Sequence, residues 1–222
     1  MRPLRLRDFF STRFPVGAQQ DVDEFMTEMM DYLSKAGLMR EAFFDVVRSG
    51  SCACTRPSTP VSEASWKVSA FFPGDVTEDD VLDLKDMMNL GFASERVEGY
   101  ECAGCKLRAD LQRVGRIVQA PRIMMVHMLR FKNDRTKIGN AVRVPLTGFE
   151  YAGKEYRLHA VINHLGRSIK GGHFTATVFD VASRTWINYN DATTREVPVD
   201  DVITPDAYYL VFVAEDDAVK ED

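Results

Sequence analysis

The chain has 222 residues, of which 45% are hydrophobic and 27% are charged, and its formal net charge is −5. These values are typical of a globular domain that buries its own core. No apolar run reaches the roughly 20 residues that a membrane span needs, and the acidic balance argues against nucleic acid or an anionic membrane as the main partner.

The first clear element is an amphipathic helix over residues 21–33. Its apolar positions recur at helical spacing, at Val22, Phe25, Met26, Met29, Met30 and Leu33. Carboxylates crowd the expected first turn, and Gly37 provides a stop. Residues 1–14 mix arginines with apolar residues, which favours another amphipathic helix over the weaker alternative of an organellar transit peptide.

A second helix is predicted over residues 78–90, with Thr77 as its N-cap, and residues 55–65 are predicted to form a loop or a frayed hairpin tip. The later part of the chain has the pattern of strands. We expect them at residues 114–118, 123–131, 156–163, 174–180, 186–189 and 208–213. Helices followed by an antiparallel sheet predict an α+β fold.

The four cysteines form two close pairs, Cys52 with Cys54 and Cys102 with Cys105. No secretory signal precedes them, so we expect a reducing cytoplasmic or nuclear location, where paired thiols favour a metal over a disulfide. Because the first pair is a CxC and not a CxxC, four reduced, metal-free cysteines remain an alternative to a shared zinc ion.

Two glycines, Gly171 and Gly172, lead directly into a strand that begins with His173. Taken alone, this turn also suits an ordinary surface histidine. The next strand, however, returns Asn190 to the same end of the hairpin. A histidine beside an amide oxygen is the orienting half of a Cys-His-Asn catalytic system, and Asp191 is a second candidate for the same task or a plain turn carboxylate.

Several motifs together resemble those of the ubiquitin-specific proteases. The segment QQDVDEF at residues 19–25 is similar to that family's QQDAHEF box, and YECAGC at residues 100–105 is similar to its second zinc pair. The strand at residues 121–131, the segments YRLHAVINHLG, GGHFTATV and YNDA between residues 156 and 192, and the ending at residues 207–212 also match, in family order.

The resemblance implies a papain-like cysteine peptidase fold with a central antiparallel sheet. We expect a catalytic domain at residues 1–214, made of a thumb remnant at 1–45, fingers at 46–120 and a palm at 121–214. The acidic tail at residues 215–222 is expected to be disordered.

By the same resemblance the ligand is ubiquitin, His173 is the general base and Asn190 orients it. The positions that match the ubiquitin-tail site are Gln20, Asp21, Glu24, Gly171, Gly172 and Phe174. Carboxylates at a helix start suit backbone N–H groups and arginine, and Asp21 can also cap its own helix. The metal ligands would be Cys52, Cys54, Cys102 and Cys105, with His127 and His159 as strand residues outside the zinc site.

The sequence departs from the family in one decisive respect, because the box that holds the nucleophilic cysteine is absent. Three explanations compete: an incomplete fragment, which we favour, an inactive ubiquitin-binding pseudoenzyme, and an enzyme completed by another chain. The expected activity of the complete protein is thiol-dependent isopeptide hydrolysis, and a zinc-finger scaffold is a weaker alternative.

Overall fold

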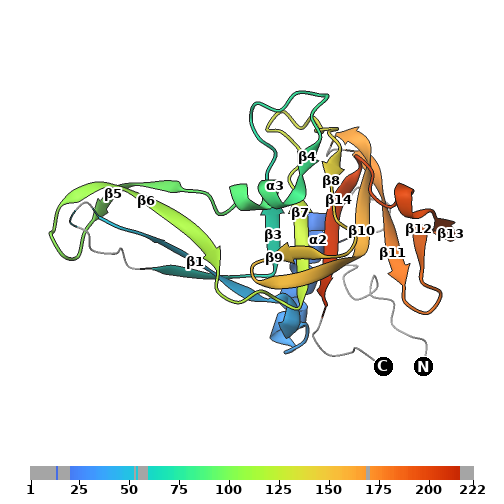
Figure 1. Ribbon diagram of the computed structural model, residues 1–222, viewed down its shortest axis with the longest axis horizontal. Coiled ribbons are helices and arrows are strands. Elements are labelled where there is room, and N and C mark those ends of the chain that lie inside the picture. Colours follow the sequence, from blue (N-terminus) through green and yellow to red (C-terminus); the bar gives the residue numbers. More distant parts are fainter. Residues whose placement is uncertain (1–13, 15–20, 53, 55–59, 169–170, 216–222) are drawn as a thin grey trace.

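The computed structural model describes residues 14, 21–52, 54, 60–168 and 171–215, and Figure 1 shows its arrangement. The helical elements are α2 (Val22–Lys35), η1 (Arg40–Ala42), α3 (Leu84–Leu90) and η2 (Val199–Asp201). The strands are β1 (Phe44–Gly50), β2 (Val61–Ser65), β3 (Lys67–Ala70), β4 (Leu82–Asp83), β5 (Glu95–Glu101), β6 (Arg108–Ile117), β7 (Ile123–Met128), β8 (Val142–Arg143), β9 (Phe149–Tyr151), β10 (Lys154–Ser168), β11 (Gly171–Asp180), β12 (Thr185–Asn190), β13 (Thr193–Val197) and β14 (Ala207–Ala214).

Two sheets dominate the molecule. The larger has eight strands in the order β13-β12-β11-β10-β14-β7-β3, with β9 paired to β10, and every pair in it is antiparallel except β3 with β7. The smaller sheet, β2-β1-β6-β5, extends away from the body as a long arm (Figure 1). The α+β class and the antiparallel central sheet are therefore confirmed.

The core lies on both faces of the larger sheet, because successive side chains of the central strand β7 point to opposite faces. Met124, Val126 and Met128 join the main cluster, which includes α3, whereas Met125 packs against Met26 and Met30 of α2. The two helices therefore cover different faces. The expected fingers range, residues 46–120, supplies nearly all of the smaller sheet, but it also contains β3, which is a strand of the larger sheet, and α3, which contacts β3.

Helix α2 begins where the sequence predicts. Asp21 is its N-cap, and the Asp21 side chain accepts a hydrogen bond from the backbone N–H of Asp23. The cap satisfies one of the N–H groups that the first turn of a helix leaves without an intrahelical partner. Its carboxylate is thereby held at the positive end of the helix.

The second predicted helix starts later than expected. Asp83, and not Thr77, is the N-cap of α3, and the side chain of Asp80 instead accepts from Thr77 within a turn. The segment between them pairs with β8, because Leu82 aligns with Val142. A local capping pattern was thus overridden by a tertiary strand pairing.

Other expectations differ in smaller ways. Of the segment predicted as a loop or a frayed hairpin tip, residues 61–65 form the strand β2, which pairs with β1, and residues 55–59 lie outside the described residues. All of the expected helix at residues 1–14 except Phe14 also lies outside them, as do Gln20 and nearly all of the acidic tail. Within the described part of the chain, no helix has both the length and the apolar character that crossing a membrane requires.

Candidate active site

The hairpin of β11 and β12 brings His173 and Asn190 together. The register pairs Ala176 with Tyr189 and Thr177 with Asn188, so Asn190 falls near the start of β11. His173 Nε2 lies 2.7 Å from Asn190 Oδ1, and about two fifths of the His173 side chain is exposed. The pair is therefore anchored by a sheet yet open to a substrate.

This contact fixes the chemistry of the imidazole. An amide oxygen can only accept a hydrogen bond, so His173 Nε2 must be the protonated nitrogen that donates to Asn190. The other ring nitrogen, Nδ1, then keeps its lone pair and can take a proton. A neutral histidine held in one tautomer by an amide is suited to act as a general base.

Asp191 is less well placed for the orienting role. Its Oδ2 lies 3.9 Å from His173 Nε2, and its side chain is 83% exposed. Asp191 also has a positive φ of 51°, a conformation that aspartate tolerates at turns. The geometry therefore favours Asn190 as the direct partner and leaves Asp191 as a charge at the rim.

The two glycines before His173 have different surroundings. A Cβ on Gly171 would meet nothing within 4 Å, whereas a Cβ on Gly172 would lie 2.4 Å from His164 Nε2. The pairing of β10 with β11 also shifts register between Leu165 and Ser168, next to the pairing of Leu165 with His173. The chain that carries His173 is thus packed closely on His164.

His164 was not among the predicted site residues. It is 3% exposed, its ring contacts Phe131, Phe174 and Tyr208, and its buried Nδ1 has no partner among the described residues. Burial and then Lys137 lower the pKa of His164, while Asp206 and Asp21 oppose that shift. The only sequence signal was its place beside Gly166 in the segment HLG.

The predicted tail-binding residues come from two elements. Asp21 is half-buried at the start of α2 and Glu24 is exposed in the first turn, whereas Gly171, Gly172 and Phe174 lie at the start of β11. Phe174 packs its ring 4.9 Å from that of His164, and the Asp21 charge acts on the same imidazole. His164 therefore lies between the two groups of predicted residues.

The four cysteines meet in the smaller sheet, between the β1–β2 and β5–β6 connections. Cys52 Sγ lies 3.7 Å from Cys105 Sγ and Cys54 Sγ lies 3.6 Å from Cys102 Sγ, and all four sulfurs lie within 4.8 Å of one another. A disulfide needs about 2.05 Å, so none of these four sulfurs is joined to another by a disulfide.

The cluster has the dimensions of a tetrahedral metal site. Zn–S bonds of about 2.3 Å place the sulfurs of a tetrahedron about 3.8 Å apart, close to the two observed distances. Backbone N–H groups of Cys105 and Gly104 lower the pKa of Cys102 to about 6, which favours the thiolate that binds metals. The CxC spacing is therefore compatible with one shared metal ion.

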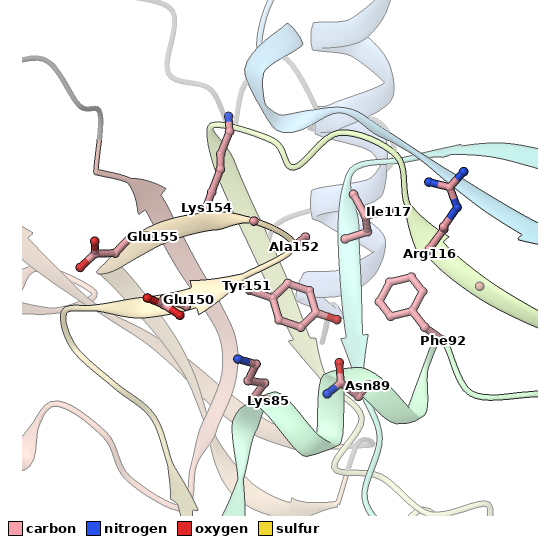
Figure 2. A pocket seen from close by; sticks show the side chains of 12 residues that line it. Lys85, Asn89, Phe92, Arg116, Ile117, Glu150, Tyr151, Ala152, Lys154 and Glu155 are labelled. Carbon is pink, nitrogen blue, oxygen red and sulfur yellow. The ribbon is translucent and has the colours of Figure 1, made fainter.

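Among the cavities that border the larger sheet, two differ clearly in their relation to the His173–Asn190 pair. One, of about 470 Å³, reaches Asn190 and is also lined by Asn188 and Thr177 among others. The other, of about 690 Å³, lies between α3, the end of β6 and the β9–β10 hairpin, and contains none of the predicted site residues (Figure 2). Tyr151 and Phe92 form its walls, so the second cavity is separate from the His–Asn pair.

The sheet and its His–Asn pair define a papain-like cysteine peptidase fold. A family model described as ubiquitin carboxyl-terminal hydrolase matches residues 2–212, and the chain belongs to that family. The chain is 28% identical over 147 residues to ubiquitin hydrolase B of Dictyostelium discoideum, and this match covers 62% of the chain. It is 24% identical over 262 residues to ubiquitin carboxyl-terminal hydrolase Usp2 of Drosophila melanogaster, covering 95%. The matches span 33% and 27% of those two proteins' own lengths.

Solved structures agree on the fold. The chain matches the SAGA DUB module of Ubp8, Sgf11, Sus1 and Sgf73 bound to monoubiquitin with a TM-score of 0.78 and 16% identity, over 95% of this chain and 52% of the matched one. The same module bound to ubiquitin aldehyde gives a TM-score of 0.76 at 15% identity, with the same two coverages.

Proposed function

We propose that this chain recognises ubiquitin and supplies the histidine and asparagine of a thiol-dependent deubiquitinating centre. The observation that carries the proposal is the 2.7 Å contact between His173 and Asn190, close to Gly171, where a Cβ would meet only open space. Family membership over residues 2–212 supports the same assignment.

In the complete centre that we propose, His173 Nδ1 removes the proton from a cysteine thiol. The thiolate attacks the carbonyl carbon of the isopeptide bond, and His173 returns the proton to the departing lysine amine. Water then hydrolyses the thioester, with His173 again as the base. Asn190 holds the imidazole in the required tautomer throughout.

The thiol of this reaction is not one of the four cysteines of the chain. All four lie together in the smaller sheet, at the far side of the molecule from β11 (Figure 1). We therefore propose that the nucleophile belongs to a polypeptide segment outside these 222 residues. Without it, the chain acts as a ubiquitin-binding module, the behaviour of a pseudoenzyme.

Ubiquitin would be held by its C-terminal tail. We propose that its C-terminal tail lies between the start of α2 and the start of β11, where Asp21 and Glu24 accept hydrogen bonds and Phe174 provides an apolar contact. Gln20 is assigned to the same site from its motif alone.

The cysteine cluster would bind one zinc ion, which would join the β1–β2 connection to the β5–β6 connection and so fix the shape of the smaller sheet's end.

Calorimetric titration of ubiquitin into the purified chain, with a parallel assay on a fluorogenic ubiquitin C-terminal amide, tests the proposal. We expect binding without turnover. Asp21→Asn should weaken binding about tenfold, which corresponds to about 1.4 kcal/mol. Asp31→Asn is the matched control, because Asp31 lies on the same helix but pairs with Lys35 at an exposed site.

Two other outcomes would contradict the proposal. Turnover that His173→Ala abolishes would show that a nucleophile is present in the chain, contrary to the proposal. Absence of both binding and turnover in a folded sample would reject ubiquitin recognition and favour the zinc-finger scaffold.

A further inference from the structure

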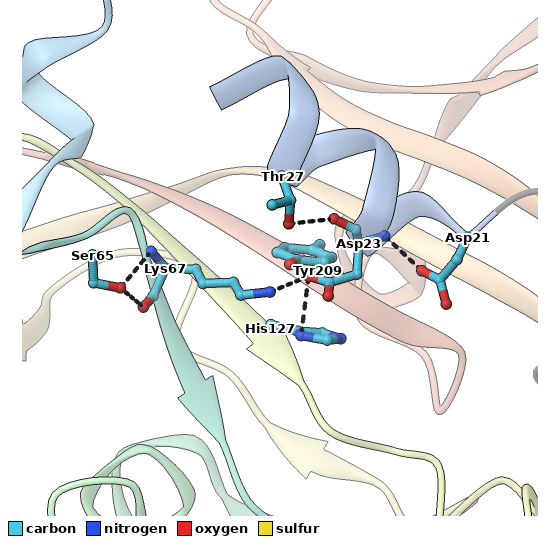
Figure 3. Close-up of polar contacts among 7 residues, drawn as sticks. All are labelled: Asp21, Asp23, Thr27, Ser65, Lys67, His127 and Tyr209. Atoms are coloured by element: carbon cyan, nitrogen blue, oxygen red, sulfur yellow. Dashed lines mark hydrogen bonds and ion pairs between the residues drawn. The ribbon is translucent and has the colours of Figure 1, made fainter. Parts of the chain in front are cut away.

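Four elements meet at the carboxylate of Asp23, directly below the start of α2 (Figure 3). Lys67 of β3 and Tyr209 of β14 both donate to Asp23 Oδ1, and His127 Nδ1 of β7 lies 3.4 Å from the same oxygen. The position of Asp23 is a histidine in the QQDAHEF pattern. A neutral histidine has one accepting nitrogen, whereas a carboxylate can accept several donors at once.

The donors are held rigidly. The ring of Tyr209, which is 0% exposed, stacks on Trp66 with an interplanar angle of 8° and on His127 with an angle of 4°. Asp23 is partly buried, which opposes its ionisation, but the hydrogen bonds from Lys67 and Tyr209 outweigh burial and keep the pKa of Asp23 below its ordinary value. Asp23 is therefore a charged anchor at neutral pH.

The same residue also holds Asp21. The backbone N–H of Asp23 donates to Asp21 Oδ1 at 2.7 Å, and the carbonyl oxygen of Asp23 accepts from Thr27 one turn later. The orientation of the Asp21 carboxylate thus depends on where the backbone of Asp23 lies. That backbone is in turn fixed to the sheet by the Asp23 side chain.

We propose that Asp23 is a positioning residue, which ties the first turn of α2 to Lys67 and Tyr209 and so aims the carboxylate of Asp21 at the C-terminal tail of ubiquitin. The inference rests on the proposed function. The inference assigns different roles to the two residues: Asp21 contacts the ligand, whereas Asp23 holds Asp21 in position without contacting the ligand.

Two ligands separate positioning from general stability: intact ubiquitin and ubiquitin without its C-terminal tail. Asp23→Asn should weaken the affinity for intact ubiquitin about tenfold, the lower end of the range for a hydrogen bond to a charged group. The affinity for tail-less ubiquitin should change by less than about twofold, because that ligand makes no contact with Asp21. If Asp23→Asn does not fold, Tyr209→Phe can replace it in the comparison of the two ligands, because it removes only one of the hydrogen-bond donors to Asp23.

A second measurement needs no ligand. In Lys67→Met, hydrogen exchange at the backbone N–H of Asp23 should become about tenfold faster while that of Met30, buried in the same helix, should not change. The double variant Asp21→Asn, Asp23→Asn should bind intact ubiquitin no more weakly than Asp21→Asn alone, because the two residues act in series.

Several results would overturn the inference. Equal losses for both ligands would make Asp23 a stability residue only, and unchanged affinity and exchange would deny it any role. If the unmodified chain binds neither ligand, the proposed function fails and the inference with it. If that chain binds ubiquitin but the Asp23 amide is already exchanging freely, the positioning role alone is wrong.

Discussion

Asn190 and His173 are joined across the β11–β12 hairpin by a 2.7 Å contact, whereas the neighbouring Asp191 lies 3.9 Å from the same nitrogen and is largely exposed. Asn190, the last residue of β12, thus supplies the oxygen that contacts the ring, while Asp191 in the following turn adds a charge at the rim. The distinction can be tested, because the two side chains have nearly the same shape.

Asn190→Ala should release the imidazole of His173. In the unmodified chain the amide oxygen selects the tautomer with the proton on Nε2, and nitrogen chemical shifts of the ring report that selection directly. We expect the two tautomers to become mixed in Asn190→Ala and to stay unmixed in Asp191→Ala. A mixed state in the Asp191 variant instead would transfer the orienting role to the carboxylate.

Gly172→Ala should destabilise the protein and Gly171→Ala should not. The new methyl group at Gly172 would lie 2.4 Å from His164 Nε2 and 2.7 Å from the carbonyl oxygen of Leu165, so a buried ring and a strand must both move. Overpacking of this kind typically lowers the free energy of unfolding by about 1–3 kcal/mol.

The matched variant at Gly171 meets open space, and its free energy of unfolding should stay within about 0.5 kcal/mol of the unmodified chain. Urea denaturation of the two variants provides the comparison. Similar stabilities for both would mean that His164 yields easily and does not define the path of β11.

The sequence predicted the structure correctly where residues that lie close together in the chain determine it. The helical periodicity located α2, with Asp21 as its cap, and the hairpin spacing brought Asn190 to His173. It failed where distant strands decide the outcome. Helix α3 is shorter than predicted because Leu82 pairs with Val142. Nothing in the sequence of either segment indicates that the two will pair.

The partners of Asp23 were hidden for the same reason. Lys67 and Tyr209 are separated from Asp23 by 44 and 186 positions in the chain. Periodicity and capping rules describe neighbours within a few residues, so they place Asp23 in the first turn of a helix. They cannot identify Tyr209, in the last strand, as its hydrogen-bond partner. His164 was overlooked because its importance lies in its contact with Gly172.

Stability should rise with pH between about 4 and 6.5 because of His127. Burial lowers the pKa of His127 from 6.5 to about 4, although Asp23 opposes that shift. Between these values the unfolded chain binds a proton at His127 and the folded protein does not, so acidification favours unfolding. The full shift corresponds to a contribution on the order of 3 kcal/mol, complete above pH 6.5 and lost as pH falls toward 4.

Thermal melts from pH 4 to pH 7 test this expectation. His127→Gln should flatten the dependence on pH. Some slope should remain in His127→Gln, because the pKa of His164 is also lowered by burial. An unaltered slope in His127→Gln would show that His127 has the same pKa in the folded and unfolded states, contrary to this expectation.

One zinc ion per chain should be bound at the cysteine cluster. The sulfur separations of 3.6 and 3.7 Å match a tetrahedral site, and a metal that binds only the folded form stabilises it by mass action. At free zinc 100 times above Kd the gain is about 2.7 kcal/mol, so a chelator should lower the Tm measurably. Cys102→Ser and Cys105→Ser should each abolish stoichiometric zinc by elemental analysis, while Ser51→Ala, beside Cys52, should retain it. A native chain that holds no zinc and exposes four thiols to a disulfide reagent would instead establish the reduced, metal-free cluster.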